Sequence, residues 1–84
     1  MLMTKLSVRI PRGLQARNTA IFVSRACAFN SDVILTKNGV SADGKKIMKV
    51  MDLHVEGGDE ITLVVSGVDE QIAVDKLREF LLDE

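Results

Sequence analysis

Hydrophobic and polar residues alternate in two stretches of the chain, one near its start and one in its second half. The first stretch runs from Met3 to Ile10, and the second contains Ile61, Leu63 and Val65. Successive side chains of a strand point to opposite faces, so a period of two is typical of a strand with one buried face. Both stretches are therefore predicted to be strands.

Two other stretches carry apolar residues at the spacing of a helix, three or four positions apart. This pattern predicts a first helix from about Ala16 to Phe29 and a last helix that opens at Asp69 or Glu70. The residues expected on the buried faces are Ala16, Ala20, Val23, Ala26 and Cys27 in the first helix, and Ala73, Leu77, Phe80 and Leu81 in the last.

The middle of the chain is predicted to contain a hairpin and a short helix. Residues 33–36 form a short β-branched run, and the Asn38-Gly39 pair that follows is typical of a two-residue type I′ turn. Residues 40–42 then return antiparallel, and residues 47–53 form about two helical turns. The order βαββαβα predicts an α+β fold: an open-faced sandwich with a four-stranded, mostly antiparallel sheet and three helices on one face. The pattern alone also allows a ferredoxin-like arrangement.

Composition narrows the classes of protein to consider. The 84 residues predict a single domain, residues 1–84, and a 46% hydrophobic content without Trp or Tyr predicts an aliphatic core. No apolar run reaches the ~20 residues that span a membrane, and the start of the chain does not resemble a signal peptide. A net charge of −1 gives no reason to expect nucleic acid, and one cysteine excludes an internal disulfide. We expect a cytoplasmic protein.

The loop before the first predicted helix is the main candidate for chemistry. Its sequence is Gly13-Leu14-Gln15-Ala16-Arg17-Asn18. The start of a helix offers unpaired backbone N–H groups and a partial positive charge, so residues 16–18 are candidate anion-binding residues. Gln15 is neutral, does not titrate, and cannot carry a phosphoryl group as a histidine can.

Residues 13–17 resemble the signature Gly-Leu/Ile-His-Ala-Arg-Pro-Ala of the HPr family, the histidine phosphocarriers of the bacterial sugar phosphotransferase system. Length and element order fit as well, so the resemblance covers nearly the whole chain and implies the HPr-type sandwich. In that family the third residue is the histidine that accepts phosphate from enzyme I. Here that position is Gln15, as in the Crh-like branch linked to catabolite repression, and Asn18 replaces the family's proline. The catalytic position is therefore degenerate.

Residues 45–53 are similar to a second segment of the family, Lys-Ser-Ile-Met-Gly-Val-Met-Ser-Leu. In Gram-positive relatives its first serine is phosphorylated by HPr kinase, and the phosphorylated protein binds a repressor. In this chain that regulatory position is Lys46. Lysine has no acceptor hydroxyl, and its charge is opposite to that of a phosphoserine. The resemblance therefore implies that both phosphorylation sites of the family are absent.

The same resemblance places residues 46–51 beside the loop that carries Arg17. The apolar residues of this segment cannot all enter a core that Val50 and Leu53 already serve, and an apolar patch rimmed by basic residues is typical of a docking surface. The alternative is that these side chains pack under a loop. The basic face is expected to contain Arg12, Arg17, Lys45, Lys46 and Lys49, and the predicted partner-binding residues are Arg17, Ala20, Lys46, Ile47, Met48, Lys49 and Met51.

Three other residues have a less specific interpretation. We interpret His54 as a solvated loop residue, Cys27 as a buried structural thiol, and Ser41 as a poor replacement for the kinase site because it lies in a strand. The sequence contains no metal-ligand cluster and no nucleophile beside a base, so we expect neither an enzyme nor a cofactor.

These observations favour a non-phosphorylatable, HPr-like regulatory or adaptor protein. Its expected partner is a transcription regulator or a metabolic or phosphotransferase-system enzyme, and it is expected to be a monomer or a strand-swapped homodimer. One alternative is a phosphocarrier that uses a relocated acceptor, such as His54 or a serine. The other is a sensor that binds an anion reversibly at the first helix.

Overall fold

The computed structural model describes residues 1–84 and has the predicted order of elements. The seven elements are β1 (Leu2–Ser7), α1 (Arg17–Cys27), β2 (Ser31–Lys37), β3 (Val40–Asp43), α2 (Ile47–Asp52), β4 (Glu60–Gly67) and α3 (Glu70–Leu82). Element boundaries differ from the predicted ones by a few residues. The largest difference is at β1, which ends at Ser7 although the alternation continues to Ile10.

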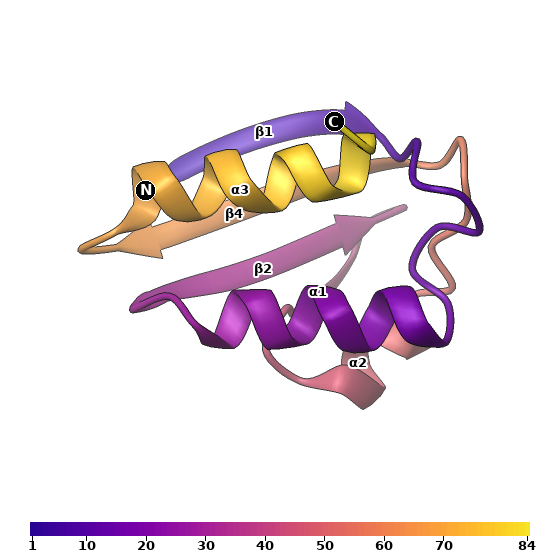
Figure 1. Ribbon diagram of the computed structural model, residues 1–84, viewed down its shortest axis with the longest axis horizontal. Helices are drawn as coiled ribbons and strands as arrows, with labels where there is room; N and C mark the ends of the chain where they lie inside the picture. The colour runs from indigo at the N-terminus through magenta and orange to yellow at the C-terminus, as the bar shows by residue number, and fades with distance from the viewer.

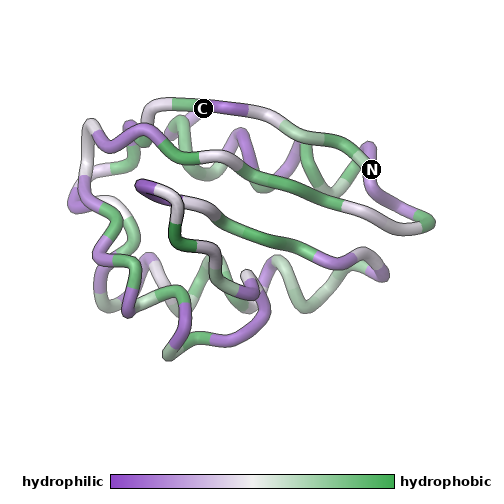
Figure 2. The backbone as a smooth tube through the Cα atoms, turned by 180° about the vertical axis from the view of Figure 1, so that it is seen from behind, coloured by the Kyte–Doolittle hydropathy of each residue, from purple (hydrophilic) through white to green (hydrophobic).

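The strands form one antiparallel sheet in the order β1-β4-β2-β3. The two central strands pair Leu63 of β4 with Leu35 of β2, and the edge strand β1 pairs Leu6 with Ile61. The helices lie in front of this sheet, with α3 over β1 and β4 (Figure 1), and the view from behind shows the face that no helix covers (Figure 2). The open-faced α+β sandwich is therefore confirmed.

The core is a single cluster of 19 buried hydrophobic residues between the sheet and the helices. It is almost wholly aliphatic, as predicted, and Phe22 is its one fully buried aromatic side chain. In α3 the buried residues are Ala73, Val74, Leu77 and Leu81, while Phe80 is only partly buried. None of the helices is long and apolar enough to cross a membrane.

The face that α1 buries differs from the predicted one. Ala26 is buried and Val23 is partly buried, as predicted, but Ala16, Ala20 and Cys27 are exposed, and Thr19 and Phe22 are buried instead. The helix begins at Arg17, and burial of a large phenyl ring releases far more free energy than burial of an alanine methyl group, so Phe22 decides the orientation. The interpretation of Cys27 as a buried thiol is therefore wrong.

The turn between β2 and β3 has the predicted geometry. Asn38 and Gly39 have φ values of 51° and 80°, and a type I′ turn requires positive φ at both central residues. Glycine adopts this conformation without strain, and asparagine tolerates it better than most residues. The hairpin then places Ser41 opposite Thr36, where the two hydroxyl groups lie 2.8 Å apart.

Candidate functional site

The loop between β1 and α1 is held in one conformation by Asn18. Its side-chain amide donates hydrogen bonds to the carbonyl oxygens of Pro11, at 2.8 Å, and Gly13, at 2.9 Å. Its backbone N–H bonds to the carbonyl oxygen of Gln15 at 3.0 Å. Asn18 therefore fixes the path of the loop with both its main chain and its side chain.

Ala16, the residue before α1, has an unusual backbone conformation, with φ 45° and ψ −117°. A positive φ is uncommon for a residue with a Cβ and costs ~1–3 kcal/mol where the surrounding structure imposes it. No side chain caps the helix here, and its first turn contains no acidic residue. The helix start therefore has a partial positive charge that no carboxylate of its own first turn offsets. The role of residues 16–18 in anion binding stays a prediction.

The loop after α2 packs directly against this loop. The N–H of Leu14 bonds to the carbonyl oxygen of Val55 at 2.9 Å. Gly13 has φ 57°, and a Cβ at this position would lie only 2.5 Å from the same oxygen. Glycine is therefore required at position 13 for the two loops to approach each other.

The two loops and α2 enclose a hollow of about 250 Å³. The structure thus brings Gln15 next to the second motif, as the sequence predicts. The side chains around the hollow are Leu14, Gln15, Ala16, Met48, Met51, Asp52, His54 and Glu56.

α2 divides its apolar residues between the core and the surface. Val50 is fully buried and Leu53 is 8% exposed, whereas Ile47, Met48 and Met51 are 41%, 64% and 40% exposed. The prediction that these three side chains cannot all enter the core is confirmed, and the structure keeps all three at the surface. They therefore form an exposed apolar patch on a helix that borders the hollow.

The basic residues near this patch fall into two groups. Arg17, Lys46 and Lys49 are exposed, and the two ion pairs of the molecule involve other residues. Lys45 is partly buried, and its ammonium group donates to the carbonyl oxygen of Phe29 at 2.9 Å. Lys45 therefore connects the β3–α2 loop to the end of α1, and its charge is less available on the expected basic face.

His54 lies closer to Gln15 than the sequence indicates. It is exposed, as expected of a loop residue, but it lines the same hollow as Gln15 and Ala16. No local pattern reveals this, because the position follows from the pairing of Leu14 with Val55. Asp52 and Glu56 line the hollow on either side of His54 in the sequence, and their charges make it unfavourable for an anion.

An ion pair fixes the loop that carries His54. The Lys37 ammonium lies 2.8 Å from the Asp59 carboxylate and donates to the His54 carbonyl oxygen at 2.6 Å. The hydrogen bond from Lys37 lowers the pKa of Asp59, and the backbone N–H of Glu56 lowers it further. Both interactions stabilise the charged form, so the loop is held most firmly when Asp59 is ionised.

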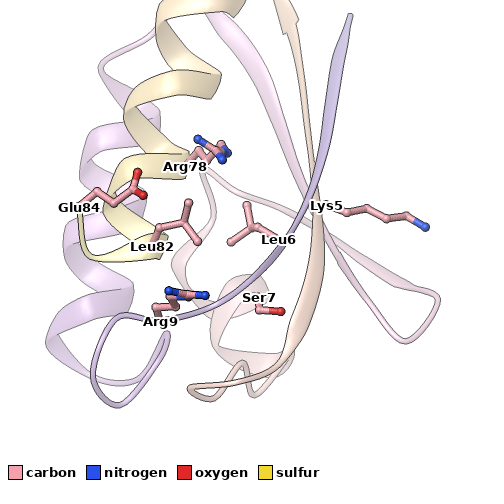
Figure 3. A pocket seen from close by; sticks show the side chains of 7 residues that line it. All are labelled: Lys5, Leu6, Ser7, Arg9, Arg78, Leu82 and Glu84. Carbon is pink, nitrogen blue, oxygen red and sulfur yellow. The ribbon is translucent and has the colours of Figure 1, made fainter.

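Another hollow, of about 350 Å³, lies between the end of β1 and the last turn of α3. Figure 3 shows Arg9 and Arg78 beside Leu6 and Leu82, whereas Lys5 points away from them on the other side of the strand. The charged groups do not converge, so this hollow is a weaker candidate site. No group of three or more His, Cys, Asp or Glu side chains is placed to hold a metal ion.

Comparison with known proteins places this site in context. A family model described as "PTS HPr component phosphorylation site" matches residues 3–83. The HPr-like protein Crh of Bacillus subtilis (strain 168) is 45% identical over 84 residues, which are 100% of this chain and 99% of that protein. The phosphocarrier protein HPr of Buchnera aphidicola subsp. Baizongia pistaciae is 34% identical over 76 residues, 90% of this chain and 89% of that one.

Two solved structures are similar over the whole chain. The crystal structure of HPr-C-His from Thermoanaerobacter tengcongensis has a TM-score of 0.93 at 30% identity, covering 100% of this chain and 98% of that one. A crystal structure of Bacillus subtilis Crh has a TM-score of 0.80 at 45% identity, covering 100% and 97%. That structure is described as a dimer with a swapping domain.

Proposed function

The chain belongs to the HPr family of the sugar phosphotransferase system, and we propose that it is a regulatory or adaptor member that carries no phosphoryl group. The observation that carries this proposal is Gln15, which occupies the position of the family's acceptor histidine at the edge of the hollow. A neutral amide is not a phosphoryl acceptor of the histidine kind. Lys46 likewise offers no hydroxyl at the family's regulatory position.

The charges around the hollow support the same proposal. Asp52 and Glu56 line it together with Gln15, so a phosphoryl group bound there would be repelled by two carboxylates. Lys46 and Lys49 make the neighbouring surface of α2 positive, opposite in sign to a phosphorylated serine. A protein with these charges has a fixed electrostatic state that phosphorylation does not switch.

The proposed working surface is the predicted partner-binding set, which we call the docking surface: Arg17, Ala20, Lys46, Ile47, Met48, Lys49 and Met51. Its apolar centre is exposed, and its basic residues form no ion pair within the chain. Methionine side chains adapt readily to the shape of a partner. These features fit a partner with an acidic rim around an apolar patch, such as a transcription regulator or a metabolic or phosphotransferase-system enzyme in the cytoplasm.

Partner capture by variants of this surface tests the adaptor role. The double variant Lys46→Glu with Met48→Glu reverses one charge of the docking surface and places a new charge at its apolar centre. Both residues are exposed, so the fold should tolerate these substitutions. We expect the double variant to lose the proteins that the wild type retains from an extract of its own organism. Lys5→Glu, an exposed charge reversal on β1, is the matched control and should retain them. Equal capture by the double variant and the control would contradict the docking surface.

A second function, phosphotransfer through His54, is favoured by one observation. His54 lines the hollow beside Gln15, so a donor enzyme docked on this loop would find an imidazole within the site. Replacement of His54 by Ala tests this candidate by intact mass after incubation with enzyme I and phosphoenolpyruvate. A phosphoryl group that appears on the wild type and is lost in the variant would establish phosphotransfer and contradict the adaptor proposal.

For the assembly state we propose a monomer that can also form a strand-swapped homodimer. β1 is an edge strand bonded to β4 alone, so its exchange between two copies would break one strand pairing. The swapped arrangement described for Bacillus subtilis Crh supports this proposal. Light scattering after size-exclusion chromatography separates the two states by mass.

A further inference from the structure

The exposed face of α3 carries an apolar centre that nothing in this chain covers. Val68, just before the helix, is 90% exposed, and Ile72, one turn later, is 53% exposed. Both line a shallow hollow of about 640 Å³, together with Asp69, Glu70, Asp75 and Glu79. We call these six residues the acidic surface. A contiguous apolar centre with a charged rim is typical of an interaction site.

Two of the four rim carboxylates of the acidic surface, Asp75 and Glu79, are free to meet a charged partner. Glu70 is paired with the N-terminal amine, and Asp69 accepts hydrogen bonds from Asn30 and Ser31. Asp75 is bonded only to the neutral amide of Gln71, and Glu79 has no ion-pair partner. Two cations lie among these four carboxylates, Lys76 and the N-terminal ammonium, so the surface stays negative overall.

The acidic surface is complementary to the docking surface of the same molecule. Each has an apolar centre on a helix, and their rims have opposite charge: Asp75 and Glu79 on one, Lys46 and Lys49 on the other. Within one molecule they cannot meet, because α3 and α2 lie on opposite sides of α1 (Figure 1) and both contribute buried side chains to the same core. A contact between them therefore requires two copies of the chain.

We infer that the chain associates head-to-tail, with the acidic surface of one copy on the docking surface of the next. Two different surfaces meet, so the contact is heterologous and leaves one surface of each kind free at the ends of the assembly. The two surfaces comprise seven and six named residues, compared with about 20 to 30 per partner in a standard interface, so the association is weak and exchanges rapidly. Charge complementarity sets its orientation and makes it sensitive to salt.

This contact regulates access to the docking surface. A copy whose Met48 lies against α3 of a neighbour cannot present that side chain to another protein, so self-association and partner binding exclude each other. The self-association depends only on the two surfaces of this chain, and not on which other protein binds the docking surface in the cell.

Sedimentation velocity with two complementary variants tests the head-to-tail contact. One variant, Lys46→Glu with Lys49→Glu, loses the docking surface, and the other, Asp75→Lys with Glu79→Lys, loses the acidic surface; all four side chains are exposed. The wild type should sediment faster as its concentration rises in low salt, and this increase should vanish in high salt. Each variant alone should lose this salt-sensitive, concentration-dependent increase. Their mixture should associate again, because the two unchanged surfaces still match and the two reversed surfaces carry opposite charges as well.

Two results would overturn the inference: no association in the mixture, or self-association of either variant at the wild-type level. A strand-swapped dimer would give the second result, because neither variant changes β1. Chemical-shift changes in wild-type protein on dilution supply a readout that does not depend on how the variants fold. The chemical-shift changes should occur at backbone amides of both α2 and α3. Shift changes restricted to β1 and β4 would also overturn the inference. Any of these results would contradict the head-to-tail contact without affecting the adaptor proposal, which partner capture by the docking surface tests separately.

Discussion

Asn18 stabilises the site loop through interactions that the family's proline cannot make. Its amide bonds to the Pro11 and Gly13 carbonyl oxygens bridge the ends of a tight loop in which Arg12, Gly13 and Ala16 all have positive φ. Proline has neither the side-chain amide nor the backbone N–H that bonds to Gln15. This chain therefore fixes the loop by hydrogen bonds.

Replacement of Asn18 by Ala should lower the free energy of unfolding by about 1 to 3 kcal/mol, because two hydrogen bonds to backbone carbonyls are lost. Urea denaturation measures this change, and Ser24→Ala on the exposed face of α1 is the matched control. Equal stability of the two variants would mean that the loop holds its shape without Asn18.

At the scale of the element, α1 is a helix that the sequence predicts but whose buried face it predicts only in part. The helical period is visible, but it fits two overlapping faces that share Ala26: the predicted one, with Ala20 and Cys27, and the observed one, with Phe22. The choice depends on where the helix begins and on how well the sheet accommodates the Phe22 ring. Both are properties of the packed molecule, so the pattern predicted the helix and only part of its buried face.

Truncation of α1 side chains checks this assignment. Phe22→Ala removes a fully buried ring and should destabilise the protein by about 3 to 5 kcal/mol. Cys27→Ser, at an exposed position of the same helix, should change stability by less than about 0.5 kcal/mol. The free energy of unfolding from urea titrations compares them. A larger loss of stability for Cys27→Ser than for Phe22→Ala would instead support the face with Cys27 that the sequence predicts to be buried.

Asp69 connects the start of α3 to the turn between α1 and β2. Its carboxylate accepts a hydrogen bond from the buried Ser31 hydroxyl and one from the backbone N–H of Asn30 at 2.8 Å. The Ser31 bond, followed by the Asn30 bond, lowers the pKa of Asp69 below its ordinary value of 3.8. No local pattern predicts these two hydrogen bonds, because the position of Ser31 beside Asp69 depends on the pairing of β2 with β4.

This lowered pKa predicts how stability depends on pH. A carboxyl group with a lower pKa in the folded state stabilises the protein above its unfolded pKa, and the contribution is lost as the pH falls through the folded pKa. Asp69→Asn should therefore destabilise the protein at neutral pH and have a smaller effect in strong acid. Thermal melts over a pH series measure the difference, with exposed Asp32→Asn as control. An effect of Asp69→Asn that is the same at every pH would contradict the assignment.

At the scale of the whole molecule, the order of elements could be predicted from the sequence, whereas the neighbours in space could not. Alternation, the Asn38-Gly39 turn and the spacing of apolar residues in the helical stretches predict all seven elements. The sheet order β1-β4-β2-β3 rests on long-range pairing, and so does the approach of His54 to Gln15. The resemblance to the HPr family supplied the fold that local patterns left open.

The same long-range packing places two surfaces of opposite charge on α2 and α3. The sequence indicated the basic surface because its motif resembles a known one, while the acidic surface has no motif. As an adaptor, the molecule would present a fixed positive docking surface where related proteins change their charge by phosphorylation. Phosphate acceptance is therefore the property that separates the adaptor proposal from phosphotransfer.

The most direct test is an intact-mass measurement after two incubations, one with enzyme I and phosphoenolpyruvate and one with HPr kinase and ATP. An HPr with the usual histidine and serine, present in each tube, should gain a phosphoryl group and show that both enzymes are active. This chain is predicted to keep its unmodified mass in both, because Gln15 and Lys46 replace the acceptors. A phosphoryl group on this chain in either tube would contradict the adaptor proposal, and fragmentation would identify the residue that accepts it.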